Sequence, residues 1–524
     1  MKTTTFTQPN YRSNYIAMQL QLPMEIEKVI DPKDEVYSFA EAMKGIDLSQ
    51  YLKKRKHRGN PGYCPTMMFN VMMFAEMEGK NSDLRELEKL CKTDLRYMLL
   101  SREQTPSHMA FQRFEQNVLK KAMREIFAEI AEHLCDQMGV NREIQYIDGT
   151  KLEANAYKNS FVYKTRVLHA RERLNERVTE AIIQLNQKYG YAYPYHWNYA
   201  SQEIGYIAQY LMEVMVREGI PIQYGRGKRK TEWQQDYDEF LGYAMKLREY
   251  EENLFLCGIR NSYSKTDPDA TMMNTKYDYY NQTGVSKPCY NLQIGVSDGL
   301  VMNAGLYQTP GDTKTFIPFM EQFYQLHGYY PKWPIADAGY GSYWNYFYCL
   351  EKGMNLGMKY NYYAKKEEPK FKKKIYNMIN WKENEKGEKI CPQGQVFNQY
   401  LYDKREEEGK YLKLTQVYGC KGCGTCPVRK ECTQGKRRTI SRNPILEEFQ
   451  QKVDENLRSA EGQEMKKQRS IQAEGTFGVM KQDRLYTRIK RRGKDNAEME
   501  VLKMLIGFNL RKYHLYRLRK QCQA

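Results

Sequence analysis

The 524-residue sequence contains no apolar run that approaches the roughly 20 residues needed to cross a membrane. Residues 1–15 also lack the apolar core of a secretory signal. These two absences argue against an integral membrane protein and against an exported one. We therefore expect the chain to stay in the cytoplasm.

Acidic residues are fewer than basic residues: the sequence has 64 Asp and Glu and 82 Lys and Arg, which gives a net charge of +18. Residues 461–524 hold 16 Lys or Arg and 7 Asp or Glu, a net +9, so half of the excess lies there. Such a balance favours a polyanionic partner, since each neutralised phosphate releases counterions. A solvated basic face is the alternative. The length predicts roughly two to four domains.

Most of the 12 cysteines are scattered, but five crowd into residues 391–432. This pattern is typical of a reduced chain with one metal-binding knot, not of a disulfide framework. Thiolates two residues apart on Gly-rich turns suit tetrahedral Zn²⁺. We expect a structural zinc site formed by Cys420, Cys423, Cys426 and Cys432, with Cys391 as a substitute. Free structural thiols are the alternative; nothing nearby resembles the thioredoxin unit of a redox pair.

Three acidic residues stand in contexts that indicate metal chemistry. Asp148 ends a strand-like run that begins at residue 143, Asp337 ends another that begins at residue 334, and Glu474 lies in a basic helical segment. Mg²⁺ prefers carboxylate oxygens, and phosphodiester chemistry uses one cation at the attacking oxygen and another at the leaving oxygen. Taken singly, each acid is more often a capping or surface carboxylate. Together they favour a nuclease-like metal site.

The segments DGTK (148–151), ADAGYGS (336–342) and EGTFGVMK (474–481) fall in the order found in DDE transposases of bacterial insertion sequences. The chain resembles this family from about residue 15 to about residue 513. The resemblance implies that Asp148, Asp337 and Glu474 are catalytic and hold Mg²⁺ or Mn²⁺. It also implies an enzyme that binds the terminal inverted repeats of its element and then cleaves and transfers DNA strands.

The expected partners follow from the same resemblance. They are double-stranded DNA, as repeat ends and as target, and a second copy of the chain in a synaptic homodimer. The expected location is the bacterial cytoplasm, in association with the nucleoid.

The expected fold class is α/β, with a ribonuclease-H-like mixed sheet as the catalytic core. An all-helical N-terminal domain for DNA binding or dimerisation is expected at 1–140. The core is expected in three pieces, at 141–152, 289–364 and 461–524. A helical Tyr-rich insertion (153–288) and an insertion with the Cys cluster (365–460) would interrupt it.

Local patterns predict the elements of this core. Alternating apolar runs at 289–296 and 300–306 around Asp298-Gly299 predict a hairpin. Residues 312–327 and 343–352 are predicted helices, and 334–336 and 355–360 are predicted strands. The resemblance, not the periodicity, supplies a topology in which Asp148 and Asp337 lie side by side.

The N-terminal region has helical periodicity. Thr105-Pro106 predicts the cap and first turn of a helix that includes Arg113. With the helix that contains Leu84 and Leu90, it could form a helix-turn-helix whose second helix reads DNA. A bundle that only packs on the core is the alternative.

The segment around Glu474 supplies further candidate DNA contacts. Lys481 lies two helical turns after Glu474, on the same face. Many relatives carry an Arg four residues before the Glu, whereas here Ser470 takes that place and Arg469 is one residue earlier. The expected DNA-binding residues of the segment are Arg469, Lys481, Arg488, Arg491 and Arg492.

The helical insertion carries a Tyr-rich run at 189–199 and then a basic loop with Arg226, Lys228 and Arg229. Aromatic rings can stack on unpaired bases while cations hold phosphates, so this insertion could grip distorted DNA near a cleavage point. Packing of the Tyr side chains into the insertion's own core is the alternative.

Two other functions stay open. One is a catalytically inactive DNA-binding protein derived from a transposase, against which the three retained acids argue. The other is a zinc-dependent nucleic-acid-binding module in which the acids are incidental. Cleavage of the element's end sequence with Mg²⁺ or Mn²⁺ would separate both from the enzyme.

Overall fold

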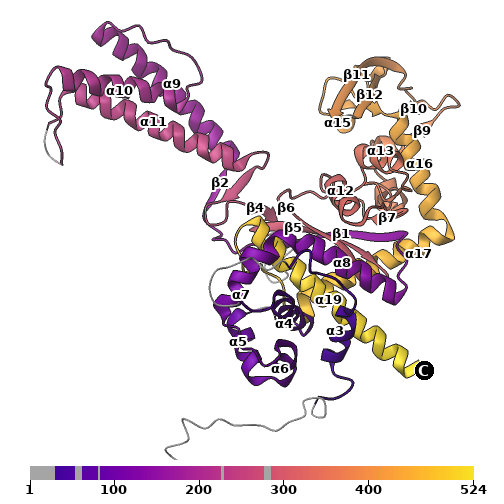
Figure 1. Cartoon of the computed structure of the whole chain (residues 1–524). Helices are drawn as coiled ribbons and strands as arrows, with labels where there is room; N and C mark the ends of the chain where they lie inside the picture. The colour runs from indigo at the N-terminus through magenta and orange to yellow at the C-terminus, as the bar shows by residue number, and fades with distance from the viewer. Residues whose placement is uncertain are drawn as a thin grey trace, which may run out of the picture. The chain divides into compact units, whose positions relative to one another are not determined.

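The computed structural model describes residues 30–52, 62–80, 83–225, 229–275, 285–409 and 411–523 (Figure 1). The chain divides into two compact units, one made of residues 1–122 and 506–524 and the other of residues 123–505. Within the described residues, no helix is both long and apolar enough to cross a membrane. Arg226 and Lys228 lie outside the described residues.

The first unit is helical. Its core is formed by aromatic and Met side chains of α3 and α4, such as Phe39, Phe69 and Phe74, which are almost fully buried. Its elements are α3 (Glu35–Met43), α4 (Pro65–Met77), α5 (Leu84–Thr93), α6 (Leu95–Ser101), α7 (His108–Phe114), the π-helical turn η1 (Glu115–Leu119), the start of α8 (Lys120–Met138) and the end of α19 (Lys494–Gln523).

The last turns of α19 belong to this helical unit. A Cβ on Gly507 would lie 2.3 Å from the carbonyl carbon of Glu76, so the glycine lets α19 approach α4 closely. Ser38 Oγ lies 2.8 Å from His514 Nδ1, which links α19 to α3. The extreme C-terminus therefore completes the helical unit that the N-terminal residues begin.

The helix predicted after Thr105-Pro106 begins later than expected. Ser107, not Thr105, is its N-cap, and the Ser107 hydroxyl accepts the Ala110 N–H at 3.3 Å. Positive φ angles at Arg102 and Glu103 end the preceding α6. The predicted cap was wrong by two residues because Ser107 offers a hydroxyl closer to the buried face of α7, which starts at Phe111.

The second unit is built on a mixed six-stranded sheet, so the chain is an α/β protein. β5 pairs antiparallel with β1 along one edge and with β4 and β6 along the other; β1 then pairs parallel with β7, and β7 with β8. The strands are β1 (Ile144–Glu153), β4 (Thr271–Asn274), β5 (Ser286–Ser297), β6 (Leu300–Tyr307), β7 (Trp333–Ala336) and β8 (Gly357–Met358).

The predicted hairpin at Asp298-Gly299 is confirmed. β5 and β6 are joined there, and both turn residues have positive φ, 43° and 84°, as a two-residue type I′ turn requires. The predicted helices and strands that follow are also present, although the first helix starts only at Phe316 and the last strand covers only two residues.

Helices that come before and after the second insertion in the sequence pack against the sheet. α12 contacts β6, α17 contacts β1 and β7, and the π-helical turn η5 contacts β1 and β5. These helices are α12 (Phe316–His327), α13 (Tyr343–Glu351), α16 (Pro444–Arg458), α17 (Ala460–Arg469), η5 (Ser470–Glu474), α18 (Gly475–Gly478) and η6 (Val479–Asp483).

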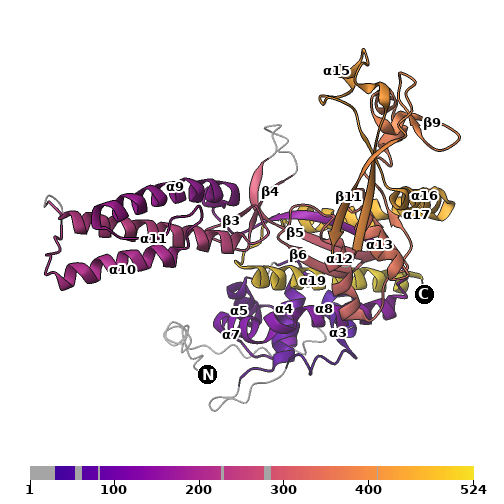
Figure 2. The same cartoon turned by 90° about the horizontal axis from the view of Figure 1, so that it is seen from above.

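The first insertion is a three-helix bundle in which α9 (Lys164–Tyr189), α10 (Ser201–Arg217) and α11 (Glu232–Cys257) run side by side (Figures 1 and 2). A two-stranded sheet, β2 (Phe161–Tyr163) with β3 (Ser262–Ser264), closes its base. The Tyr-rich run divides: Tyr199 is buried and Tyr189, Tyr191 and Tyr193 pack on the bundle core, as the packing alternative expects. Tyr195 and Trp197 are exposed.

The second insertion has short strands and a small core of its own. Its longest element is the hairpin of β11 and β12 (Figure 2), which β13 extends. Its elements are η2 (Lys365–Glu367), α14 (Pro369–Lys372), η3 (Met378–Asn380), β9 (Lys382–Glu383), β10 (Lys389–Ile390), β11 (Gln399–Glu408), β12 (Tyr411–Gly419), η4 (Lys421–Cys423), α15 (Arg429–Cys432) and β13 (Ile440–Arg442).

Candidate active site

Strand register brings Asp148 and Asp337 to the same level of the sheet. β1 and β7 pair in parallel with Tyr146 beside Ile335, and the same offset of 189 residues matches Asp148 with Asp337, directly after β7. Asp337 Oδ1 accepts the Gly339 N–H at 2.8 Å, which fixes its side chain in the loop that follows β7. Backbone pairing thus brings two acids that are far apart in the sequence to the ends of neighbouring strands.

Glu474 approaches from the helical segment that contacts β1 and β5. Arg469 Nη2 lies 3.1 Å from Glu474 Oε1, and Arg469 Nη1 lies 3.4 Å from Asp148 Oδ2. The guanidinium therefore joins an acid of the sheet to the acid of the helix.

The spacing of Arg469 and Glu474 depends on a π-helical turn. Residues 470–474 form η5, whose hydrogen bonds span five residues instead of four. One turn of this kind brings residues five apart onto one side of the helix. The π-helical turn thus accommodates the five-residue spacing between Arg469 and Glu474, a feature that helical periodicity could not predict.

Burial and neighbouring charge perturb Asp148. Desolvation is the largest influence and raises the pKa of its carboxyl from 3.8 to about 6. The Arg469 guanidinium and the Gly149 N–H oppose this rise, while Asp337 and Glu474 add to it. Asp148 thus experiences both other acids electrostatically, in a site that disfavours a further negative charge.

Arg469 has unused hydrogen-bonding capacity. Its side chain is 10% exposed, and among the described residues neither Nε nor Nη1 has a hydrogen-bond partner, although Nη1 makes the ion pair with Asp148. Buried donors of this kind cost free energy unless a ligand satisfies them. An oxyanion bound beside Asp148 would accept from them.

Two lysines lie beside the acids. Lys481 Nζ donates to Thr150 Oγ1 at 2.6 Å, two residues along β1 from Asp148. Lys359, directly after β8, has its pKa lowered mainly by burial and further by Arg469 and Lys466, while Asp337 and Glu474 oppose the change. The sequence gives no sign of a role for Lys359, because this residue belongs to none of the recognisable motifs.

The other predicted cations lie elsewhere. Arg488 Nε is 3.8 Å from Glu153 Oε1, and Arg492 Nε donates to the Asn155 carbonyl at 3.0 Å. Glu153 is five residues beyond Asp148 on β1, about 17 Å along an extended strand. The Arg491 backbone N–H donates to Glu500 Oε2 at 3.0 Å. Arg229 is exposed on the connection between α10 and α11.

The second insertion gathers four of the five clustered cysteines around one core. Cys420 and Cys423 are buried with Trp381, Phe397 and Ile440, and Cys391 and Cys432 pack against them. Cys426 is not part of this hydrophobic cluster, but burial raises the pKa of the Cys432 thiol and Cys426 lies near enough to help raise it. The Arg438 N–H donates to Cys423 Sγ at 3.0 Å. In the described part of the chain, no group of three or more His, Cys, Asp or Glu side chains is placed to hold a metal ion, which includes both these cysteines and the three acids Asp148, Asp337 and Glu474.

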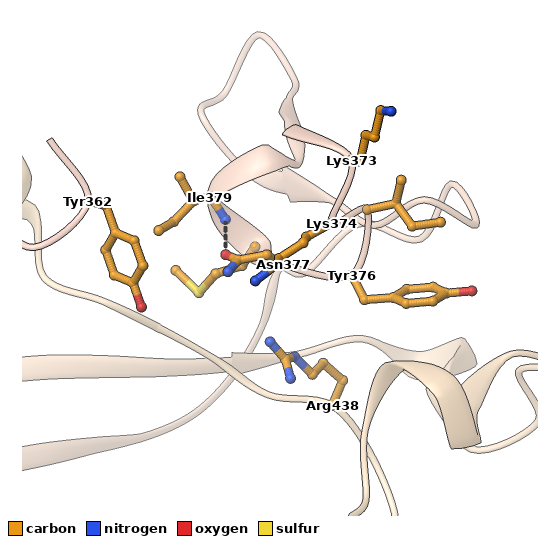
Figure 3. Close-up of a pocket in the computed structure, with 9 residues that line it drawn as sticks. Tyr362, Lys373, Lys374, Tyr376, Asn377, Ile379 and Arg438 are labelled. Atoms are coloured by element: carbon orange, nitrogen blue, oxygen red, sulfur yellow. Dashed lines mark hydrogen bonds between the residues drawn. The ribbon is translucent and has the colours of Figure 1, made fainter. Parts of the chain in front are cut away.

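A basic cavity of about 710 Å³ lies next to this cysteine cluster (Figure 3). Arg438 points into it from one side, and Tyr362 and Tyr376 flank it. Lys373 and Lys374 also line it. No pattern in the sequence pointed to this cavity, because its lining comes from residues 362–379 together with Arg438.

Comparisons with known proteins agree with the motif reading. A transposase DDE domain model matches residues 390–514, which include the cysteine cluster and Glu474, and a second transposase domain model (DUF772) matches residues 24–117. These matches define the class: the chain is a transposase. More narrowly, they support a DDE transposase of the insertion-sequence type. Neither the comparison with curated proteins nor that with solved structures gives a match.

Proposed function

We propose that this transposase binds the terminal inverted repeats of its element and uses Asp148, Asp337 and Glu474 for metal-dependent strand cleavage and strand transfer. The observation that supports this most is the electrostatic coupling at Asp148, whose pKa is raised to about 6 by burial and by both other acids. Perturbed carboxyls that share a site with partners from distant segments are typical of functional sites. Asp148 and Asp337 lie outside both matched ranges, so their role rests on this geometry and on the motif order.

The ligand chemistry of the three acids suits Mg²⁺ or Mn²⁺, although the described structure does not gather them into a metal site. Carboxylate oxygens are the ligands that these cations prefer, and a buried acid beside two others gains most from a bound cation. With Asp148, Asp337 and Glu474 as ligands, the cations would supply activation of the attacking oxygen and stabilisation of the leaving oxygen.

The protein's own groups would hold the DNA strand. Arg469 offers buried donors without a hydrogen-bond partner in the part of the chain that the structure describes, which suits a phosphate oxygen next to Asp148. Lys481, two residues along β1 from Asp148, would bring a further positive charge to the same phosphate. Arg488, Arg491 and Arg492 would contact the duplex farther along.

The strand order β6–β5–β1–β7–β8, antiparallel in its first part and parallel in its second, supports a ribonuclease-H-like core. The N-terminal helices would bind DNA or support a synaptic homodimer. The helical bundle would contact DNA through its exposed rings, Tyr195 and Trp197.

We also assign a structural Zn²⁺ to the second insertion. Its ligands would be Cys391, Cys420, Cys423 and Cys432, since these four share one small core and Cys426 stands outside it. Cys391, which the sequence offers as a substitute ligand, would thus take the place of Cys426. The backbone N–H of Arg438 on Cys423 Sγ would stabilise a thiolate there.

Strand cleavage is the direct test. The substrate would be a duplex that carries the inverted repeat found next to the gene, incubated with the full-length protein and Mg²⁺ or Mn²⁺. We expect Asp148→Asn and Glu474→Gln to abolish cleavage while binding to the duplex persists, because the acids act on metal and not on the fold. Asp298→Asn, in the β5–β6 turn, is the matched control and should cleave as the wild type does.

The rival functions predict different results. Repeat-specific binding without cleavage by the wild type, under either cation, would identify an inactive DNA-binding derivative. Binding that disappears when zinc is removed, again without cleavage, would identify a zinc-dependent binding module.

A further inference from the structure

The basic cavity beside the cysteine cluster has no role in the proposed chemistry at the three acids. Its lining comes from residues 373–379, Tyr362 and Arg438, all of which belong to the second unit. Its volume of about 710 Å³ lies within the range of roughly 300 to 1,000 Å³ that ligand pockets occupy. The cavity is therefore large enough for a small organic ligand.

Arg438 points into this cavity with an unused donor (Figure 3). The cysteine core holds the residue in place, because its backbone N–H donates to Cys423 Sγ at 3.0 Å and its Nη1 donates to the Cys432 carbonyl at 3.4 Å. Its Nε is shielded from solvent and, among the described residues, has no hydrogen-bond partner. An anionic ligand oxygen would satisfy this donor and recover the free energy that its burial costs.

Two exposed lysines, Lys373 and Lys374, add further positive charge to the lining. Their neighbour Lys372 pairs with Glu367 at 3.1 Å, whereas within the described ranges neither Lys373 nor Lys374 has an acidic partner. The nine lining residues thus include three cations and no acid. This charge favours an anionic ligand over a neutral or cationic one.

The cavity also has aromatic walls, Tyr362 and Tyr376 (Figure 3). Tyr362 packs on Phe371 with the ring centroids 5.7 Å apart, yet it is 43% exposed. The Tyr376 hydroxyl donates to Glu431 Oε2 at 2.8 Å, which fixes the second ring. The remaining apolar side chains of the lining are Ile375, Met378 and Ile379. A ring that is held in place and still accessible is a platform on which a nucleobase can stack.

We propose that this cavity binds one unpaired nucleotide of a DNA strand, with the base against the Tyr362 ring and the phosphate on Arg438 and Lys374. The inference rests on the proposed function, since DNA opened at an element end would supply such a strand. Inorganic phosphate would use the cations but not the rings. Duplex DNA keeps its bases stacked inside, so it would leave the rings unused. Rings and cations together therefore favour a single strand.

The test measures binding of a short fluorescein-labelled oligo(dT) strand to the full-length protein by fluorescence anisotropy. We expect Tyr362→Ala to weaken this binding by about 5- to 100-fold, the usual effect of removing one stacking platform. Tyr362→Phe keeps the ring and should bind as the wild type does. A folded Tyr362→Ala protein with wild-type affinity for the strand would overturn the assignment.

A second pair of variants separates the cavity from the general positive charge of the segment. Lys373→Ala with Lys374→Ala removes two cations of the lining, and Lys365→Ala with Lys370→Ala removes two exposed cations outside it. We expect the first pair to lower affinity for the strand by about 10-fold and the second by less than about 3-fold. Equal losses would mean that the strand is held by overall charge, which rejects the cavity as its site.

Arg438→Gln should weaken binding of the strand by about 10-fold as well, because it removes a charge-assisted hydrogen bond. If this variant does not fold, the lysine pairs and Tyr362→Ala still decide. Photocrosslinking of a strand that contains 5-iododeoxyuridine, followed by mass spectrometry, locates the base directly. We expect a crosslinked peptide from residues 362–379, and crosslinks confined to other segments would contradict the proposal.

Competition separates the sources of the ligand. Oligo(dT) should bind much more tightly than dTMP or inorganic phosphate, because a strand also contacts the protein on both sides of the bound nucleotide. Displacement of the strand by an equal concentration of dTMP would assign the cavity to a free nucleotide. Tighter binding of oligo(rU) would assign it to RNA. Either result overturns the proposal.

The proposed function can fail separately from this inference. If the wild type cleaves the repeat-end duplex but Tyr362→Ala binds oligo(dT) normally, only the nucleotide site is wrong. If the strand binds and crosslinks at the cavity as expected but no cleavage occurs under either cation, the nucleotide site stands and the catalytic assignment fails.

Discussion

The acid-bearing sheet and the cysteine-rich insertion place their functional side chains by opposite means. In the sheet, Asp148, Asp337 and Glu474 come from segments more than 130 residues apart and depend on strand register and a π-helical turn. In the insertion, four cysteines within residues 391–432 pack around a small local core. A site assembled by a large buried sheet can stay preorganised without a ligand, whereas a small core of few buried residues needs one.

The two regions also divide the positive charge. Residues 365–442 hold 20 Lys or Arg against 10 Asp or Glu, a net +10, beside the net +9 of residues 461–524. The expectation that the excess positive charge is concentrated around Glu474 therefore missed an equally large excess in the second insertion. The basic cavity lined by Lys373, Lys374 and Arg438 belongs to this second excess (Figure 3).

Removal of zinc should separate the two regions most strongly. Structural zinc contributes on the order of 10 kcal/mol of apparent binding free energy in small metal-dependent folds. We expect Cys423→Ser, or a zinc chelator, to open residues 376–442 to proteolysis while the sheet stays protected. Limited proteolysis with mass spectrometry measures this. Cys426→Ser is the matched control and should retain zinc; an intact insertion in verified zinc-free protein would contradict the assignment.

The sheet should respond to pH instead. The folded pKa of Asp148, about 6, lies above the unfolded value of 3.8, so the fold favours the protonated carboxyl. Stability of the metal-free protein should therefore fall as pH rises from 3.8 to about 6, by about 3 kcal/mol at most from this group. The loss is complete above that range and absent below it.

Urea unfolding of the metal-free wild type and of Asp148→Asn, at several pH values from 4 to 7, measures this difference. Asn does not titrate, so the stability of the variant relative to the wild type should increase with pH. A pH-independent difference would show that Asp148 is not held in an environment that disfavours its charge.

Within the basic surface, Lys481 should matter to chemistry. Lys481→Ala is expected to lower cleavage per bound complex by about 10- to 100-fold, because the lost amine orients the scissile phosphate. DNA affinity should change little, since one contact among many is removed. Single-turnover cleavage and filter binding on the same end duplex give the two quantities. Equal losses on the end duplex and on unrelated DNA, with normal cleavage per complex, would assign Lys481 to the general surface.

The smallest effects are expected at Arg488 and Arg492, beside the far end of β1. Each Ala substitution should weaken binding to any duplex by at most about 1 kcal/mol and reduce the salt slope by about one. Cleavage per bound complex should stay unchanged, as measured in the Lys481 experiment. A selective cleavage defect in either variant would mean that DNA brings this end of β1 to the reacting phosphate.

Local chemistry made much of the fold predictable. The β5–β6 hairpin followed from Asp298-Gly299, and α12, α13 and β7 followed from apolar periodicity. The Ser107 cap was missed because Thr105-Pro106 offers a competing start signal. The division of the Tyr-rich run was not predictable, because Tyr191 and Tyr195 differ in burial through their neighbours on α10, not through their own sequence context.

The sequence by itself determined the class of protein and its candidate acids, because motif order and charge balance are properties of the chain. Tertiary structure alone decided which cations face those acids. Arg469 reaches Asp148 through a π-helical turn, and Arg488 lies beside Glu153, because backbone geometry converts equal spacings into different positions.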